Sequence, residues 1–142
     1  MTAAAAAPVR VPTDAVRAGP AARIAAGLLG GVAAFQVALV AGAPWGAAAW
    51  GGAFPGVLPV GMRLASAAST AVYLLLTVAL VSPAVPATRR RQVLAVATVF
   101  LAVGAVLNLV SPSGVERAIW TPVSAALAVL LWLARRDGSG RP

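Results

Sequence analysis

The sequence predicts an all-α, polytopic membrane protein in which four transmembrane helices form an antiparallel bundle. Apolar residues make up 61% of the 142 residues and charged residues only 10%, whereas soluble domains average roughly 45–50% and about 25%. The chain contains apolar segments that are each long enough to cross a bilayer core, which takes about 20 residues. Arginines separate these segments and do not gather on one soluble face, so we expect the lipid bilayer, and not nucleic acid, as the partner.

The first predicted helix covers residues 24–42, which contain no charged residue. We expect the preceding residues 1–21 to form a disordered cytoplasmic tail, because they hold an alanine run and prolines without a sustained apolar period. Arg10, Arg17 and Arg23 also resemble the basic start of a cleaved signal peptide, which remains the alternative. The apolar stretch is longer than the usual signal-peptide core of about 7 to 15 residues.

Small residues recur every four positions along this first helix, at Gly30, Ala34, Ala38 and Gly42. Small side chains allow two backbones to approach closely, and such contacts drive helix association in lipid. We therefore expect this stripe to pack against another helix of the bundle. A homodimer seam is the alternative.

Residues 43–61 predict a structured extracytoplasmic loop rich in proline, glycine and tryptophan, since proline and glycine at this density end helices. Trp45 and Trp50 suit an aromatic belt at the membrane interface. The neighbouring glycines favour a loop that folds back onto the mouth of the bundle.

Three further helices complete a membrane domain over residues 22–134. Prolines around residues 82–86 end the second helix, and a short loop at residues 111–114 separates the third from the fourth. The charged, glycine-containing residues 135–142 predict a cytoplasmic tail. The predicted boundaries are 62–81, 92–110 and 118–134.

Arginine counting predicts the orientation, because cytoplasmic segments retain basic residues. If both termini are cytoplasmic, nine arginines lie inside, and only Arg63 and Arg117 lie outside. Arginine without lysine, with heavy use of alanine, glycine, proline and valine, is typical of a high-GC bacterial genome. We therefore expect a multi-pass protein of a bacterial cytoplasmic membrane. The nine inner arginines are Arg10, Arg17, Arg23, Arg89, Arg90, Arg91, Arg135, Arg136 and Arg141.

The residue inventory excludes several chemistries. The chain has no cysteine, histidine or lysine, so thiolate and imidazole catalysis, Schiff bases, and zinc, haem or iron–sulfur ligation by these residues are unavailable. We predict no catalytic residue, no metal site and no cofactor.

The candidate binding residues gather at the extracytoplasmic ends of the helices. Arg63 and Arg117 lie in the first turns of their helices, where the helix dipole disfavours a cation. We expect Glu116 to pair with Arg63, which would leave Arg117 for an anionic lipid headgroup or a membrane-protein partner. Snorkelling of both arginines to headgroups is the alternative. The full candidate set is Trp45, Trp50, Arg63, Asn108, Glu116, Arg117 and Trp120.

Polar residues inside the predicted helices complete the expectations about packing. Asn108 needs an interhelical hydrogen bond if it is buried. The other intramembrane polar residues could line a polar path, but hydrogen bonds between helices are commoner. They are Gln36, Ser66, Ser69, Thr70, Tyr73, Thr77 and Thr98.

The tryptophans, prolines and charges of the outer loops resemble an uncharacterised family of small four-helix bacterial integral membrane proteins, over residues 30–123. The resemblance implies an integral membrane protein with a distinctive outer face and implies no activity. The matching residues are Gly42-Ala43-Pro44-Trp45-Gly46, Trp50-Gly51-Gly52, Leu58-Pro59, Arg63, Asn108, Ser111-Pro112-Ser113, Glu116-Arg117, Trp120 and Pro122.

Taken with the residue inventory, these patterns favour a non-catalytic membrane protein with an outer-face polar site. A small transporter or channel-like protein is one alternative, although a cation-coupled exporter needs a carboxylate in the membrane and the predicted helix cores contain none. A membrane-embedded enzyme acting on a lipid-linked substrate is the other, and it would have to use Glu116 with Asn108 and the arginines.

Overall fold

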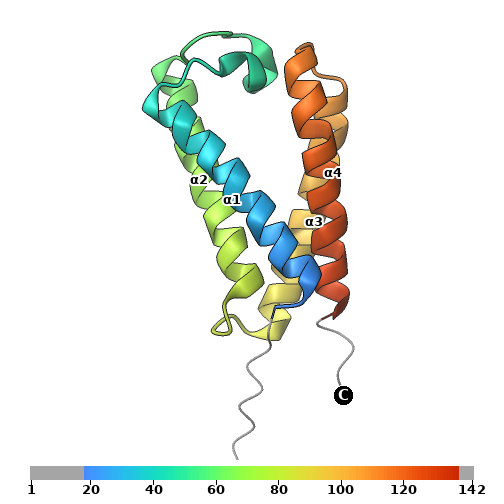
Figure 1. The fold of residues 1–142 in the computed structure, drawn as a ribbon. Helices are drawn as coiled ribbons and strands as arrows, with labels where there is room; N and C mark the ends of the chain where they lie inside the picture. Colours follow the sequence, from blue (N-terminus) through green and yellow to red (C-terminus); the bar gives the residue numbers. More distant parts are fainter. Residues whose placement is uncertain (1–17, 138–142) are drawn as a thin grey trace, which may run out of the picture.

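The computed structural model describes residues 18–137, and within that range the chain is helical without strands (Figure 1). The helices are α1 (Pro20–Ala41), α2 (Val60–Val81), α3 (Ala87–Leu109) and α4 (Gly114–Asp137), and all four are long and apolar enough to cross a membrane. The shortest have 22 residues, or about 33 Å at 1.5 Å per residue, against a hydrocarbon core of about 30 Å. The predicted fold class is confirmed.

The observed helices are longer than the apolar segments from which they were predicted. α3 begins at Ala87 and not at residue 92, and α4 runs from Gly114 to Asp137 and not from 118 to 134. Helix ends can continue into the interfacial layer, where charged side chains are tolerated, whereas hydropathy marks only the apolar part. Of the two predicted tails, residues 1–17 and 138–142 lie outside the described residues, and the remainder belongs largely to α1 and α4.

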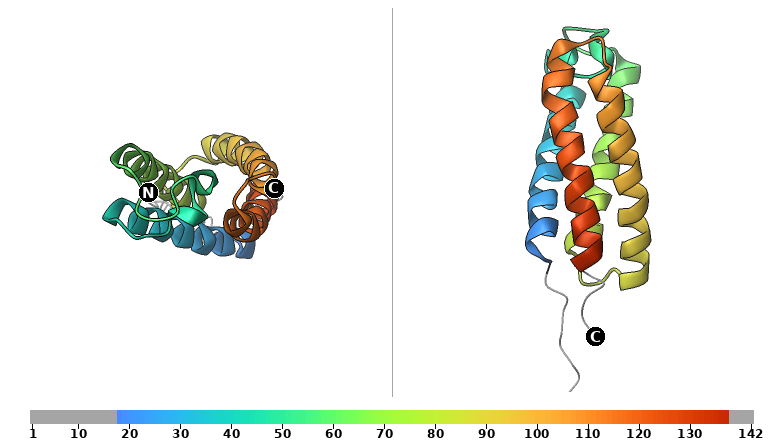
Figure 2. Two further views of the ribbon diagram at one scale, coloured as in Figure 1. Left: turned by 90° about the horizontal axis from the view of Figure 1, so that it is seen from above. Right: turned by 90° about the vertical axis from the view of Figure 1, so that its right-hand side faces the viewer.

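The helices are arranged as two closely packed antiparallel pairs, α1 with α2 and α3 with α4 (Figures 1 and 2). α1 also packs against α4, while α2 and α3 contact one another less. The start of α1, the α2–α3 connection and the end of α4 lie together at what we call the terminal end (Figure 1). The long loop after α1 and the short α3–α4 turn lie at the opposite end, which we call the loop end.

The apolar core is concentrated toward the terminal end. Its fully buried leucines come from three helices and include Leu29, Leu94, Leu127 and Leu131. A separate small cluster at the loop end consists of Leu39, Ala49 and Leu58. Large side chains on the outer faces are also apolar, which suits a lipid environment.

The small-residue stripe is not the surface by which α1 contacts the other helices. Gly30 and Ala34 are exposed, Ala38 is half-buried, and a Cβ atom at Gly30 would meet no atom within 4 Å. The packed face carries Ala22, Ala25, Leu29, Val32 and Ala33 instead. The expectation that Gly30 and Ala34 pack within the bundle is therefore wrong, whereas the packing of the half-buried Ala38 and the homodimer alternative stay untested.

Gly42, the last residue of that stripe, ends α1. Its φ of 97° lies in the left-handed region, its N–H donates to the Leu39 carbonyl, and the Ala43 N–H donates to the Ala38 carbonyl. This pair of bonds is the Schellman arrangement that closes many helices. Gly42 is required by backbone conformation and not by helix packing.

Each helix carries an arginine as its fourth residue, namely Arg23, Arg63, Arg90 and Arg117. Arg63 donates from Nε to the Val40 carbonyl at 2.8 Å, in the last turn of α1. Arg90 donates to the carbonyls of Ala79 and Ser82 at the end of α2, and Arg117 donates to the Ser111 carbonyl beyond α3 at 2.8 Å.

These hydrogen bonds explain how arginines can be accommodated in the first turns of helices, where the helix dipole disfavours a cation. A cation in the first turn of a helix is disfavoured by that helix's dipole, but the same cation is favoured at the C-terminus of another helix. Arg63, Arg90 and Arg117 therefore satisfy carbonyls at the end of the preceding helix and need no external anion to do so.

Candidate functional site

The long loop folds over the loop end of the bundle and is fastened to α4. It contains two short 3₁₀ turns, Gly46–Ala48 and Trp50–Gly52. The Ser113 hydroxyl donates to the Ala47 carbonyl at 2.6 Å, and the Trp120 indole N–H donates to the Ala48 carbonyl at 2.6 Å. The expected structured loop at the bundle mouth is present.

Glu116 of α4 forms hydrogen bonds that hold this loop in place. One carboxylate oxygen accepts the Gly51 N–H at 3.2 Å, and the other accepts the Ser111 hydroxyl. Its own N–H donates to the Ser113 hydroxyl at 3.2 Å, so Ser113 caps the start of α4. The side chain is 8% exposed. A carboxylate in the first turn of a helix is also stabilised by the helix dipole.

Aromatic side chains support the loop from α1 and α4. The Phe35 ring stacks on Trp45, with centroids 6.0 Å apart, and meets the Trp120 ring edge to face at 4.7 Å. Trp50 donates from its indole nitrogen to the Ser66 hydroxyl of α2 at 3.2 Å. The loop is therefore tied to three helices through rings that also present apolar surface.

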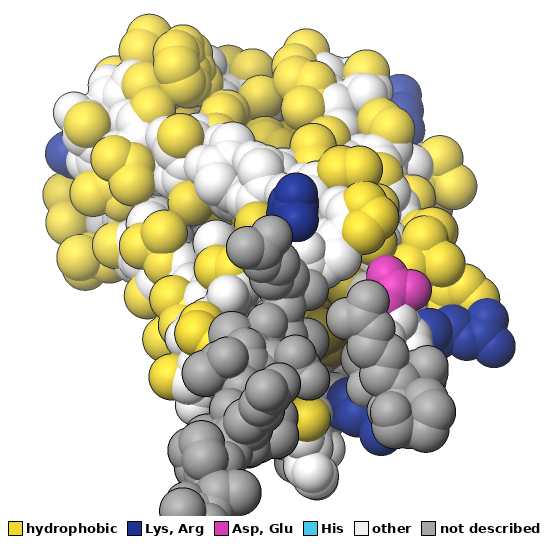
Figure 3. Space-filling view, turned by 60° about the horizontal axis from the view of Figure 1, so that its bottom comes forward, with side chains coloured by type: hydrophobic (Ala, Val, Ile, Leu, Met, Phe, Trp, Pro, Cys, Tyr) yellow, Lys and Arg dark blue, Asp and Glu magenta, His cyan; other side chains and the backbone are white. Residues whose placement is uncertain are grey.

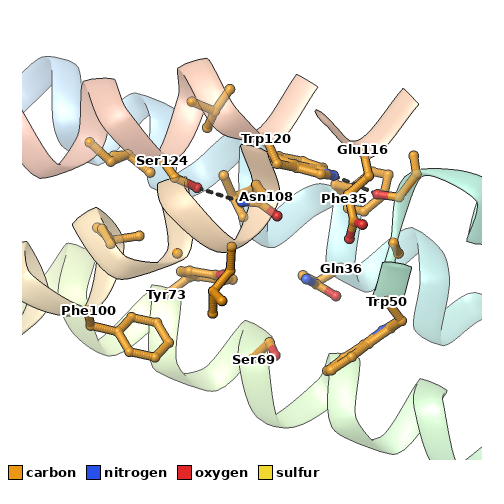
Figure 4. A pocket seen from close by; sticks show the side chains of 18 residues that line it. Phe35, Gln36, Trp50, Ser69, Tyr73, Phe100, Asn108, Glu116, Trp120 and Ser124 are labelled. Atoms are coloured by element: carbon orange, nitrogen blue, oxygen red, sulfur yellow. Dashed lines mark hydrogen bonds between the residues drawn. The ribbon is translucent and has the colours of Figure 1, made fainter. Parts of the chain in front are cut away.

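Beneath the loop, between the two helix pairs, lies a cavity of about 420 Å³ (Figure 4). This volume falls within the range of about 300–1,000 Å³ that is usual for small-molecule sites. Its lining combines aromatic rings with a few polar groups from all four helices and the loop. The lining residues are Val32, Phe35, Gln36, Ala48, Ala49, Trp50, Ser69, Tyr73, Phe100, Leu101, Gly104, Leu107, Asn108, Glu116, Trp120, Val123, Ser124 and Leu127.

Some polar groups of the cavity have hydrogen-bond partners among the described residues, and one has a buried atom without a partner. Asn108 on α3 donates to the Ser124 hydroxyl on α4 at 3.2 Å, which is the interhelical bond expected for Asn108. Gln36, by contrast, has a buried amide oxygen without a hydrogen-bond partner among the described residues. Figure 4 shows its side chain among the cavity-lining groups, between Trp50 and Asn108. An unsatisfied buried acceptor costs about 1–3 kcal/mol, so a rotation of the Gln36 side chain that turned this oxygen toward a donor on a bound molecule would be favoured.

Several intramembrane hydroxyls do not form the interhelical bonds that were expected. Ser69, Thr70, Thr77 and Thr98 each donate to the carbonyl four residues earlier in their own helix. This back-bonding is common for serine and threonine in helices. Of these hydroxyl residues, only Ser69 also lines the cavity.

The expected ion pair between Glu116 and Arg63 is absent from the described part of the chain. Arg63 is occupied by the Val40 carbonyl and Glu116 by Gly51 and Ser111. Arg117 is likewise bonded to the Ser111 carbonyl, and neither arginine lines the cavity. The structure thus brings Trp50, Asn108, Glu116 and Trp120 together around the cavity, whereas Trp45, Arg63 and Arg117 are not part of its lining.

Phe35, Ser111 and Ser113 were not among the candidate binding residues, although Ser111 and Ser113 belong to the outer-loop pattern on which the family resemblance is based. For Ser113 a signal existed, because Ser113 and Glu116 form the Ser-x-x-Glu pattern of a helix start. That pattern places Glu116 at the third helical position with its carboxylate turned back toward the chain before the helix. No local signal marks Phe35, whose role depends on the position of the loop.

The described residues contain no group of three or more His, Cys, Asp or Glu side chains that could hold a metal ion. Comparison with protein-family models, with curated proteins and with solved structures finds no match to this chain. The fold and the site define a class on their own, which is a bundle of four helices long and apolar enough to span a membrane, with a partly open, loop-covered cavity that is lined largely by aromatic and aliphatic side chains.

Proposed function

We propose that this chain is a non-catalytic membrane protein that binds a lipid-soluble, amphipathic molecule in the cavity beneath its loop. The observation that carries the proposal is the unpartnered amide oxygen of Gln36, one of the few polar groups in a cavity lined mainly by aromatic and aliphatic side chains. An apolar body would pack against the rings, and a hydroxyl, amine or amide N–H on the molecule would satisfy Gln36.

Access from the bilayer is supported by the loose packing between α2 and α3. Phe100 and Leu107 of α3 line the cavity and are each 63% exposed, so their side chains border both the interior and the outer surface. The loop covers the cavity from the loop end through its bonds to α4. A ligand dissolved in lipid would therefore enter sideways between α2 and α3.

The charges of the cavity lining favour an uncharged or positively charged polar group. The lining includes one carboxylate, Glu116, and no arginine. Burying an anion beside a carboxylate without a compensating cation is unfavourable. This argues against the anionic headgroup that the sequence suggested for the outer face.

Photolabelling with an aliphatic alcohol that carries a diazirine tests this proposal in lipid nanodiscs. We expect saturable labelling of cavity residues such as Tyr73 and the buried Leu127, with competition by the unlabelled alcohol. The matching alkyl diazirine without a hydroxyl lacks a donor for Gln36 and is expected to label exposed residues without saturation.

Two glycine substitutions provide the control. Gly104→Phe fills the cavity, because Gly104 lines it with open space beside its Cα, whereas Gly30→Phe adds the same ring on the outer face of α1. Saturable labelling should disappear in the first variant and persist in the second. Equal labelling of both variants, or uniform labelling of all exposed residues, would overturn the proposal.

We also propose that the terminal end faces the bacterial cytoplasm. Among the described residues, six arginines lie in the helix segments at the terminal end, and Arg63 and Arg117 lie at the loop end; basic residues favour the cytoplasmic side. Alkaline phosphatase fused after Pro142 should be inactive, because it folds only in the periplasm. An active fusion would reverse the orientation. The six arginines are Arg23, Arg89, Arg90, Arg91, Arg135 and Arg136.

A further inference from the structure

Glu116 carries the one charged side chain among the described residues that line the cavity beneath the loop. Its oxygens accept hydrogen bonds from two neutral donors, the Gly51 N–H and the Ser111 hydroxyl. The Ser111 oxygen itself accepts the Ser113 N–H at 3.3 Å, so the Ser111 proton is directed to Glu116. Both oxygens of Glu116 therefore act as acceptors, which is the arrangement of an ionised carboxylate.

The negative charge of Glu116 has no cationic hydrogen-bond partner in the described part of the chain. Arg63 donates to the Val40 carbonyl and Arg117 to the Ser111 carbonyl, and neither arginine lines the cavity. A buried charge is costly to keep unless it is paired. An ionised carboxylate has about four lone-pair sites, and two are used here, so Glu116 can accept further hydrogen bonds from a cation in the cavity.

The rings around Glu116 also suit a positively charged group. Trp50 and Trp120 line the cavity, and Figure 4 shows the Glu116 carboxylate in the space between them. Their indole N–H groups already donate to the Ser66 hydroxyl and the Ala48 carbonyl. The two rings therefore leave no N–H for an anion, whereas the π face of a tryptophan attracts a cation.

We infer that the molecule bound in this cavity is a lipophilic amine, held as its ammonium ion at Glu116. The inference rests on the proposed function and narrows it, because an uncharged polar group would also satisfy that function. The ammonium group donates to the free lone pairs of Glu116 through charge-assisted hydrogen bonds. The hydrocarbon chain packs against the rings and leucines of the lining.

Competition against the diazirine-carrying alcohol tests the charge in the wild-type protein. Decylamine, decanol and decanoate share one chain, and decylamine, like a lysine side chain, is protonated at neutral pH. Nanodiscs of zwitterionic lipid avoid attraction of the cation to the bilayer surface, and each concentration is expressed as the amount that empty nanodiscs take up. Decylamine should compete at about tenfold lower concentration than decanol, the usual gain when one hydrogen-bond partner is charged. Decanoate should compete less well than decanol.

Two carboxamide substitutions localise the charge that is recognised. Glu116→Gln removes the charge in the cavity, and Asp137→Asn removes the same charge from the exposed last residue of α4, at the terminal end. In the space-filling view of that end, an acidic side chain lies at the surface beside arginine side chains (Figure 3). Glu116→Gln should weaken competition by decylamine about tenfold more than competition by decanol. Asp137→Asn should change neither by more than about twofold, because salt screens distant exposed charges.

The outcomes that would overturn the inference differ from those that would overturn the proposed function. Equal potency of decylamine and decanol in the wild type would show that charge is not recognised, and this comparison needs no variant to fold. If Glu116→Gln melts cooperatively but weakens both competitors equally, Glu116 acts only by holding the loop. Equal loss of decylamine in Glu116→Gln and Asp137→Asn would show an effect of net charge and no site. These outcomes leave the proposed function standing, whereas unsaturable labelling by the alcohol would overturn both.

Discussion

Gly46→Ala is expected to cause the largest loss of stability among substitutions in the loop. A Cβ atom at Gly46 would lie 1.8 Å from the Phe54 carbonyl oxygen and 2.8 Å from the Gly56 carbonyl oxygen. These are backbone atoms, so they cannot rotate away as a side chain could. The Gly46 N–H also donates to the Gly56 carbonyl at 3.0 Å. Moving the two segments of the loop apart to make room for the Cβ atom would break that hydrogen bond. We expect a loss of about 3 kcal/mol, at the upper end for overpacking, measured by denaturation in detergent.

Gly56→Ala is the matched control for this substitution. Gly56 lies in the same loop, and a Cβ atom there would meet nothing within 4 Å. The alanine should change the free energy of unfolding by no more than about 0.5 kcal/mol, as at ordinary surface positions. Equal stabilities for the two variants would mean that the loop does not have the close backbone contact at Gly46.

Glu116→Ala is expected to have a comparably large effect, because it releases the loop from α4. The substitution leaves the Gly51 N–H and the buried Ser111 hydroxyl without their acceptor. Hydrogen bonds to charged groups contribute about 1.5–3 kcal/mol each, so we expect a loss of about 3 kcal/mol. Glu116→Gln keeps one carbonyl oxygen and should lose roughly half as much. The fluorescence of Trp50 and Trp120, which line the cavity under this loop, should shift in the alanine variant.

Double-mutant cycles separate this role of Glu116 from the ion pair suggested by the sequence. Glu116 and Arg63 share no hydrogen-bond partner, so Glu116→Ala and Arg63→Ala should add within about 0.5 kcal/mol. Glu116→Ala and Ser111→Ala should not add, because both remove the same bond. A strong coupling of Glu116 to Arg63, with none to Ser111, would restore the ion pair and contradict the structure.

The number and class of the helices could be predicted from the sequence because lipid imposes one simple requirement. A spanning segment must be apolar over a fixed length and must satisfy its backbone internally, which a helix does. The helix ends could not be placed as well. Residues Ala87 to Arg91 belong to α3, which begins directly after its N-cap Pro86, but they lie outside the apolar segment and hydropathy does not mark them.

The packing face of α1 was not predictable from small-residue spacing, because this helix has small residues on two faces. Ala22, Ala25 and Ala33 are buried, whereas Gly30 and Ala34 are exposed. The spacing of small residues shows on which faces another helix could approach closely, but it does not show on which of these faces a helix packs. Choosing between the faces requires the position of the other helices.

Four of the seven candidate binding residues line the cavity, and they could be selected because polar and aromatic residues are rare in this chain. Trp50, Asn108, Glu116 and Trp120 all line the cavity. Two of their partners, the Gly51 N–H and the Ala48 carbonyl, are backbone groups of the loop and could not be predicted. Backbone donors and acceptors are the same at every position, so only the folded path of the loop decides which of them are available.

The bonds between consecutive helices join residues that are close in the chain, whereas the bonds that close the cavity join distant ones. Arg63, Arg90 and Arg117 reach back across 23, 11 and 6 residues, while the loop is bonded to α4 across 65, 66 and 72 residues. Closing a longer segment costs more conformational entropy, and partial opening begins where few contacts hold a segment. Release of the loop from α4 would therefore open the cavity at the loop end while both helix pairs stay assembled, so this opening and the unfolding of the bundle are separate events.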